Sequence, residues 1–299
     1  FAGASGIVAV VLVAAPLLIL VYASFLPSGW QAEVRLTLDH YVAVLREPKS
    51  LEVVQNTLLV SGGATLLATG LGTTLAWLVA RTDMPGRQLL DPLNLIPFYL
   101  SPLTGAIAWI YLAAPRVGLL NRYLGDALNV YGIGGMVWVM GLFFTPEIYL
   151  FASSALRRMD PALEESARVH GSGVLTTTLR ITLPLIRPAM LAGMVLVFVS
   201  SLGEFSIPVT LGTPVGRDVL VTRIYAAMED VPPNHNMASA LSLLLVAPTV
   251  ALVLVHRRLL EGRSYAVIGG RAYRPAQVQL GRWGWVALAV NVAYLVCAV

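Results

Sequence analysis

Long uncharged apolar stretches alternate with short polar segments along the chain. No charged side chain occurs in residues 1–32, and a second uncharged run extends from Val53 to Ala80. A helix needs about 20 apolar residues to cross a bilayer, so each run is long enough for one span. We predict membrane spans at 6–26, 53–80, 89–114, 131–156, 188–212 and 237–256. Residues 283–299 are uncharged but too few for a confident span, so they predict the start of a seventh helix.

Composition agrees with this pattern. Hydrophobic residues make up 57% and charged residues 12% of the 299 positions, and the mean hydropathy is +0.75. Soluble domains carry about 25% charged residues, so the sequence predicts an all-α, polytopic transmembrane bundle. The chain begins at Phe1 without the basic segment of a signal peptide, and we expect further residues to precede it.

Two of the predicted spans have unusual composition. The span at 53–80 contains many small residues, which allow helices to approach closely in lipid. The span at 89–114 contains Pro92, Pro97 and Pro102, so we expect it to be kinked or interrupted. Interrupted spans line the pathway in many transporters, but simple kinking explains the prolines equally well.

Two acids, Glu147 and Glu204, fall inside predicted spans. A charge in mid-bilayer costs about 2.5–3.5 kcal/mol on insertion scales, so each acid should face protein or water. Either acid lines a translocation path, or each serves a structural hydrogen bond. Both are therefore candidate path residues.

The basic residues indicate the orientation. Of the 20 Lys and Arg residues, thirteen lie in the segments 81–88, 157–187 and 257–282, and seven lie in the loops of the opposite face. The positive-inside rule makes the thirteen-residue face cytoplasmic. The same rule explains the net charge of +4 without a nucleic-acid partner.

Residues 160–188 form a polar island on that cytoplasmic face. Asp160 can cap a helix, and Pro161 suits its first position. Gly171 can adopt the left-handed conformation that ends a helix. A second helical run follows and should be broken, or a new helix begun, at Pro184. The sequence therefore predicts a short helix, a sharp bend and a second short helix between two spans.

The spacing Glu165-x-Ala167-x-x-x-Gly171, then nine residues, then Ile181-x-Leu183-Pro184 resembles the EAA loop of MetI-like ABC importer permeases. In that family the loop is a coupling helix that docks into a cleft of a cytoplasmic ATPase. The resemblance implies this set of ATPase-coupling residues: Glu164, Glu165, Ala167, His170, Gly171, Ile181, Leu183 and Pro184. Ser166 and His170 depart from the usual Ala and Asp. An ordinary amphipathic cytoplasmic loop is the alternative.

Later residues resemble the N-terminal half of fused, ferric-iron-type permeases. They comprise Leu211–Pro214, Thr222–Tyr225 and the stretch from Tyr265 to Pro275. We expect four regions: 1–52, a first span and external loop; 53–260, a permease core with coupling helices at 160–184; 261–282, a basic linker; and 283–299, the start of a second, truncated half.

The resemblance implies alternating access in a bacterial inner membrane. The implied partners are two ATPase subunits, a periplasmic substrate-binding protein and the lipid bilayer. The implied cargo is ferric iron, with thiamine, phosphonate, polyamine or sulfate as alternatives.

The sequence contains no nucleotide-binding loop Gly-x-x-x-x-Gly-Lys-Ser/Thr and no Gly-x-Ser-x-Gly elbow, so we expect neither ATP hydrolysis nor other catalysis by this chain. Its four scattered histidines and its one cysteine, Cys297, predict no metal site, and no cofactor is expected. An ion-coupled secondary transporter with Glu204 as its ion site is a less favoured alternative, and a membrane-embedded enzyme is less favoured still.

Overall fold

The computed structural model describes residues 2–27, 36–160, 162–260 and 278–299. Within these ranges the regular elements are helices, apart from one isolated bridge between Thr82 and Val278. Four described helices are long and apolar enough to cross a membrane, and the number is five if a pair bent by 98° is counted as one span. The all-α membrane bundle is therefore confirmed. Phe1, Pro161 and the predicted linker up to residue 277 lie outside the described residues.

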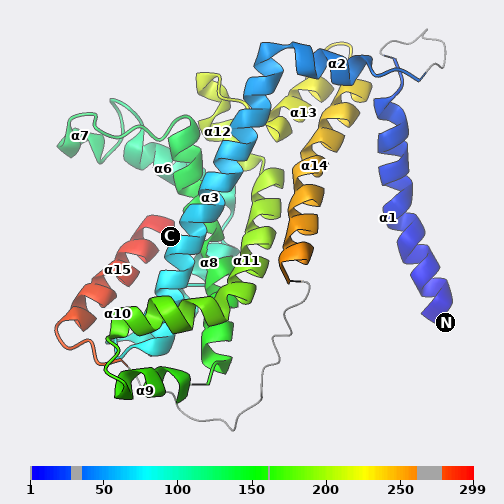
Figure 1. Ribbon diagram of the computed structural model, residues 1–299. Helices are drawn as coiled ribbons and strands as arrows, with labels where there is room; N and C mark the ends of the chain where they lie inside the picture. Colours follow the sequence, from blue (N-terminus) through cyan, green and yellow to red (C-terminus); the bar gives the residue numbers. More distant parts are fainter. Residues whose placement is uncertain (1, 28–35, 161, 261–277) are drawn as a thin grey trace.

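The centre of the bundle is a pair of long helices, α3 (Pro48–Arg81) and α8 (Ile133–Arg158), which lie side by side (Figure 1). The predicted close packing of small residues is confirmed at Gly72. A Cβ atom there would lie 2.8 Å from the Thr145 carbonyl oxygen of α8. By contrast, Gly70 has nothing within 4 Å of such an atom, so only some of the small residues serve packing.

The third predicted span is interrupted, as its prolines indicate. Helices α4 (Arg87–Leu93) and α5 (Ile96–Tyr99) are followed by α6 (Pro102–Ala113), which is bent by 98° from them. Pro102 begins α6, because proline is tolerated in a first helical turn where no N–H donor is needed.

The fifth span differs from its prediction at its cytoplasmic end. The chain stays helical from α10 (Val174–Thr177) through a π-helical turn, η1 (Thr178–Thr182), into α11 (Leu183–Gly203). The expected break at Pro184 is therefore absent, although α11 does begin next to it. Proline lacks an N–H and crowds the carbonyl four residues earlier, and the wider π turn directly before Pro184 accommodates both effects.

The outer end of this span also differs. We predicted a span to residue 212, but α11 ends at Gly203 and a separate short helix, α12 (Ser206–Leu211), follows. Glu204 between them has extended backbone, with ψ of 122°. Apolar composition alone does not reveal this break.

The predicted loop at 213–236 contains two further helices, η2 (Thr213–Val215) and α13 (Leu220–Glu229). Helix α13 packs against the sixth span, α14 (His235–Leu260). Short helices also occur in the other outer loops, α2 (Asp39–Arg46) and α7 (Asn121–Leu124). Figure 1 shows α2, α12 and α13 gathered at one end of the bundle.

The two remaining helices lie at the two ends of the chain. Helix α1 (Ala2–Ser24) packs against α14, and its segment Ala14–Ser24 is apolar but shorter than the four candidate spans. Helix α15 (Trp283–Ala298) packs against α8, and the Trp109 indole Nε1–H donates to the Cys297 carbonyl at 3.1 Å. The predicted seventh helix is thus present, and it is held against the core.

Candidate functional site

The predicted coupling helix is α9 (Ala162–Val169), which lies with α10 at the end of the bundle opposite α2 and α13 (Figure 1). Its start is capped, because the Ala162 N–H donates to Asp160 Oδ1 at 2.9 Å. Its end has the left-handed glycine that the sequence predicts, with φ of +81° at Gly171. The N–H groups of Gly171 and Ser172 donate to the carbonyls of Arg168 and Ala167, which is the Schellman pattern.

The outer surface of this region is apolar and exposed. Leu163 is 49% and Val169 is 85% exposed at the two ends of α9, and Leu175 of α10 is 72% exposed. Glu165 and Ala167 are half-buried on the same helix. Large apolar side chains that stay exposed on a polar helix are available for contact with another protein.

His170 is exposed and follows α9 directly. Its Nδ1–H donates to the Ser166 carbonyl at 2.8 Å, since a carbonyl oxygen can only accept. The same carbonyl also accepts the His170 backbone N–H at 3.2 Å, so the ring adds a second hydrogen bond at the helix end. This use of the ring leaves Nε2 as the atom available to a partner.

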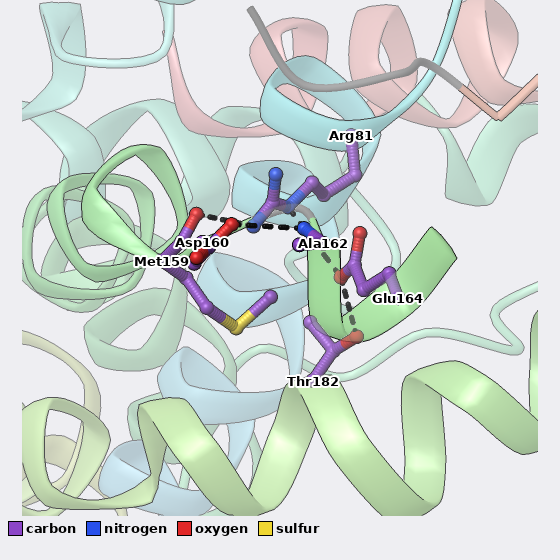
Figure 2. Close-up of polar contacts among 6 residues, drawn as sticks. All are labelled: Arg81, Met159, Asp160, Ala162, Glu164 and Thr182. Carbon is purple, nitrogen blue, oxygen red and sulfur yellow. Dashed lines mark hydrogen bonds and ion pairs between the residues drawn. The ribbon is translucent and has the colours of Figure 1, made fainter. Parts of the chain in front are cut away.

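The inner surface of α9 is polar and buried, because Glu164 is only 4% exposed. Thr182 Oγ1–H donates to Glu164 Oε1 at 2.6 Å, and Arg81 Nε lies 3.6 Å from the same oxygen (Figure 2). Arg81 is 2% exposed, and its Nη2 also donates to the Met159 carbonyl at 3.4 Å. Glu164 therefore faces the bundle, and any part it has in coupling is indirect.

Arg81 is a functional candidate that the sequence-based predictions did not include. The available signal was its position, as the first charged residue after the long uncharged run that ends at Ala80. The partner could not be read from the sequence, because Arg81 and Glu164 are 83 positions apart.

The second half of the motif lies at the entrance to α11. Ile181 is half-buried in η1, Leu183 packs against the core next to α3 and α8, and Pro184 is exposed. The hydrogen bond from Thr182 to Glu164 joins this half to α9. The structure thus brings the two halves of the motif together through two residues that the motif itself does not include.

The two acids within predicted spans have different surroundings. Glu204 Oε1 accepts the N–H groups of Ser206 at 2.8 Å and Ile207 at 3.4 Å, so it caps the start of α12. This contact supports the structural interpretation of Glu204 without excluding a path role. Glu147 is half-buried in α8, and its Oε2 atom is buried without a hydrogen-bond partner among the described residues.

Within the described ranges, no group of three or more His, Cys, Asp or Glu side chains could hold a metal ion. The polar chemistry described above is therefore concentrated at the end of the bundle, around α9, and at the two isolated acids.

The described residues form a helical membrane bundle with an interrupted span and an exposed short helix at one end. Residues 69–263, more than half of the chain, match the family described as "Binding-protein-dependent transport system inner membrane component". The chain belongs to that family, and it is a multi-pass inner-membrane protein.

Curated relatives transport different cargo. The chain is 25% identical over 242 residues to the ferric transport system permease protein FbpB of Actinobacillus pleuropneumoniae, covering 79% of this chain and 35% of that protein. It is 31% identical over 225 residues to the molybdenum transport system permease protein ModB of Mycobacterium tuberculosis, covering 74% and 84%. The chain thus spans about a third of the length of the ferric relative.

Solved structures share the fold. The match to a bacterial ABC transporter that imports the polysaccharide alginate has a TM-score of 0.66 at 21% identity, covering 85% of this chain and 91% of that chain. The match to the MetNI methionine ABC transporter in inward-facing conformations has a TM-score of 0.57 at 15% identity, covering 70% and 94%. At these identities the likeness establishes the fold alone.

Proposed function

We propose that this chain forms the membrane pathway of a binding-protein-dependent importer for ferric iron, driven by a separate cytoplasmic ATPase. The observation that carries the proposal is α9, a short capped helix at the basic end of the bundle with an exposed apolar surface. Its end groups Leu163 and Val169 are 49% and 85% exposed, which suits insertion into a cleft of a partner.

The ATPase would supply the work. We propose that two copies close on ATP and displace α9, and that α9 then rocks the spans between inward- and outward-open states. Glu165, Ala167 and His170 would contact the ATPase, whereas Gly171 would set the angle at which α9 leaves for α10. Ile181, Leu183 and Pro184 would pass the displacement into α11.

The opposite end would receive cargo from a periplasmic binding protein. Helices α2, α12 and α13 gather there (Figure 1). Glu52 and Arg217 form an ion pair that ties the loop before α13 to the start of α3. Glu204, at the break between α11 and α12, is our candidate for a path residue near this end, and Glu147 is the second candidate.

Ferric iron is favoured by two matches to ferric permeases, at 25% identity over 237 and 242 residues. Molybdate or sulfate is the second candidate cargo. It is favoured by the 31% identity to a molybdenum permease, of which the chain covers 84%.

Purification of the full-length protein from its native membrane tests the proposal. We expect an ATPase subunit to co-purify, and the complex in proteoliposomes to import radioactive iron with ATP and a ferric-loaded binding protein. Import of molybdate or sulfate, and not iron, would support the second candidate. Uptake that follows an ion gradient without any ATPase would support the secondary transporter and refute the proposal.

A further inference from the structure

The carboxylate of Glu164 connects three helical elements. Glu164 belongs to α9, its Oε1 atom accepts the Thr182 hydroxyl of η1 at 2.6 Å, and Arg81 at the end of α3 lies 3.6 Å away (Figure 2). All three side chains are at most 5% exposed. The cluster is therefore a buried polar contact among α9, η1 and α3, at the end of the bundle where α9 lies.

The polypeptide chain connects α9 to two other helices of the bundle, α8 before it and α11 after it. Residues 159–161 lead from α8 into α9, and residues 170–182 lead on to α11. Backbone packing of α9 is chiefly against α10 and η1. Helix α3 has no such covalent connection, so Arg81 is its direct side-chain contact with α9 in the described part of the chain.

The backbone of Arg81 also contacts Val278, which precedes α15. Its carbonyl oxygen accepts the Val278 N–H at 2.9 Å, and the Asp83 N–H donates to the Val278 carbonyl at 3.2 Å. The end of α3 is thus attached to α9 through a side chain and to residue 278 through the backbone. A displacement of this end of α3 would therefore move both α9 and residue 278.

We infer that Arg81 and Glu164 are positioning residues that make α9 and the end of α3 move as one body, a role that rests on the proposed function. Apolar contacts tolerate sliding, but two buried charges that separate leave each other unpaired, which is strongly unfavourable. The neighbouring Arg168 repels the positive charge of Arg81, whereas the Glu164 carboxylate stabilises it. Thr182 extends the same link to the start of α11.

A purely structural role would require only that the cluster helps the chain to fold. The two roles differ in the ATP hydrolysed per molecule imported. A folding role changes the amount of complex, whereas a positioning role changes this ratio in the complex that does form.

The test uses the full-length chain with its ATPase and loaded binding protein in proteoliposomes. Glu164→Gln keeps the shape and an acceptor for Thr182 but removes the charge. We expect at least a ~5-fold rise in ATP hydrolysed per imported molecule, the lower range of coupling between sites. Thr182→Val should act in the same direction, and Thr182→Ser, which restores the hydroxyl, should recover the wild-type ratio.

Asp83→Asn is the matched acid-to-amide control, because Asp83 is exposed just after α3 and the amide keeps an acceptor for the Leu280 N–H. We expect it to leave the ratio at the wild-type value. A wild-type ratio in Glu164→Gln, measured in intact complex, would overturn the link and leave the proposed function standing. Failure of the wild-type chain to bind any ATPase would instead refute the proposed function.

A second variant covers the case in which Glu164→Gln fails to fold. Arg81→Cys and Glu164→Cys, made together in a full-length chain whose native cysteines, Cys297 included, are replaced by serine, can be joined by a short bis-maleimide. Joined protein should couple ATP hydrolysis to uptake better than unjoined protein. Equal coupling in the two forms, or arrest by the linker, would overturn the proposal.

Discussion

Gly72→Ala tests whether the close approach of α3 to α8 sets the stability of the bundle. A Cβ atom at Gly72 would lie 2.8 Å from both the Ile148 Cβ and the Thr145 carbonyl oxygen, and 2.9 Å from the Tyr149 nitrogen. Ordinary contact begins at 3.4 Å, so the methyl group is about 0.6 Å too close to atoms of another helix. Two of these are backbone atoms, which no side-chain rotation can move away.

The expected cost follows from this geometry. Overpacking of this kind costs about 1–3 kcal/mol, while alanine gains up to about 1 kcal/mol over glycine within a helix. Gly70→Ala removes the second effect from the comparison, because Gly70 lies on the same helix with nothing within 4 Å. The difference between the two variants should therefore be about 1–3 kcal/mol, with Gly72→Ala the less stable.

Unfolding of the purified protein in mild detergent, followed by tryptophan fluorescence, measures this difference. Gly141→Ala provides a further comparison. Its methyl group would lie 2.5, 2.9 and 3.0 Å from Leu67 Cδ2, Cγ and Cβ, which are all side-chain atoms, so we expect a smaller loss than against the backbone atoms at Gly72. Stabilities of Gly70→Ala and Gly72→Ala within about 0.5 kcal/mol of each other, the usual range for surface changes, would refute the packing argument.

Three further changes test the site and the outer loop. Gly171→Val should abolish binding-protein-stimulated ATP hydrolysis while membrane insertion persists, because a β-branched residue is strained at φ of +81°. Gly173→Val, at φ of −68°, is the control, and ATP hydrolysis should still be stimulated by the binding protein in this variant. Glu204→Gln keeps an acceptor for the α12 cap, so reduced vesicle uptake would implicate the charge in the path, and unchanged uptake would leave only the cap. Asn121→Ala removes three hydrogen bonds to the backbone of Ala114 and Leu128, and each costs about 1–3 kcal/mol if its partner stays buried. The loop before α8 should therefore become sensitive to protease, and resistance equal to wild type would contradict this.

The sequence predicts the spans well because lipid imposes a simple rule. A chain that crosses hydrocarbon must satisfy its backbone internally and avoid charge, so the uncharged run at 53–80 and the helix Pro48–Arg81 nearly coincide. Local backbone chemistry was equally readable at Gly171, whose left-handed φ depends on its own lack of a Cβ. The interruption near Pro102 follows in the same way from proline.

Features that depend on several elements were not readable. The break at Gly203 is stabilised by Glu204 capping the helix that follows, and the sequence does not say which N–H groups a carboxylate will meet. Pro184 was expected to break a helix or to begin the next one; α11 does begin beside it, but the π turn before it keeps the chain helical, which the sequence did not indicate. Arg81 and Glu164 pair because the fold brings the end of α3 to the first turn of α9.

Helix α3 is attached at both of its ends, and this arrangement bears on how work crosses the membrane. Near its start, the Asn56 Nδ2–H donates to the Asp218 carbonyl at 3.0 Å and the Leu220 N–H donates to Thr57 Oγ1 at 2.8 Å. At its end, Arg81 pairs with Glu164. Its 34 residues span about 51 Å as one helix, and packing against α8 resists bending. A movement of α9 that α3 follows must therefore reach the loop before α13 on the opposite face. A coupling defect in Glu164→Gln would, on this reasoning, also appear as a weaker response of that outer loop to ATP.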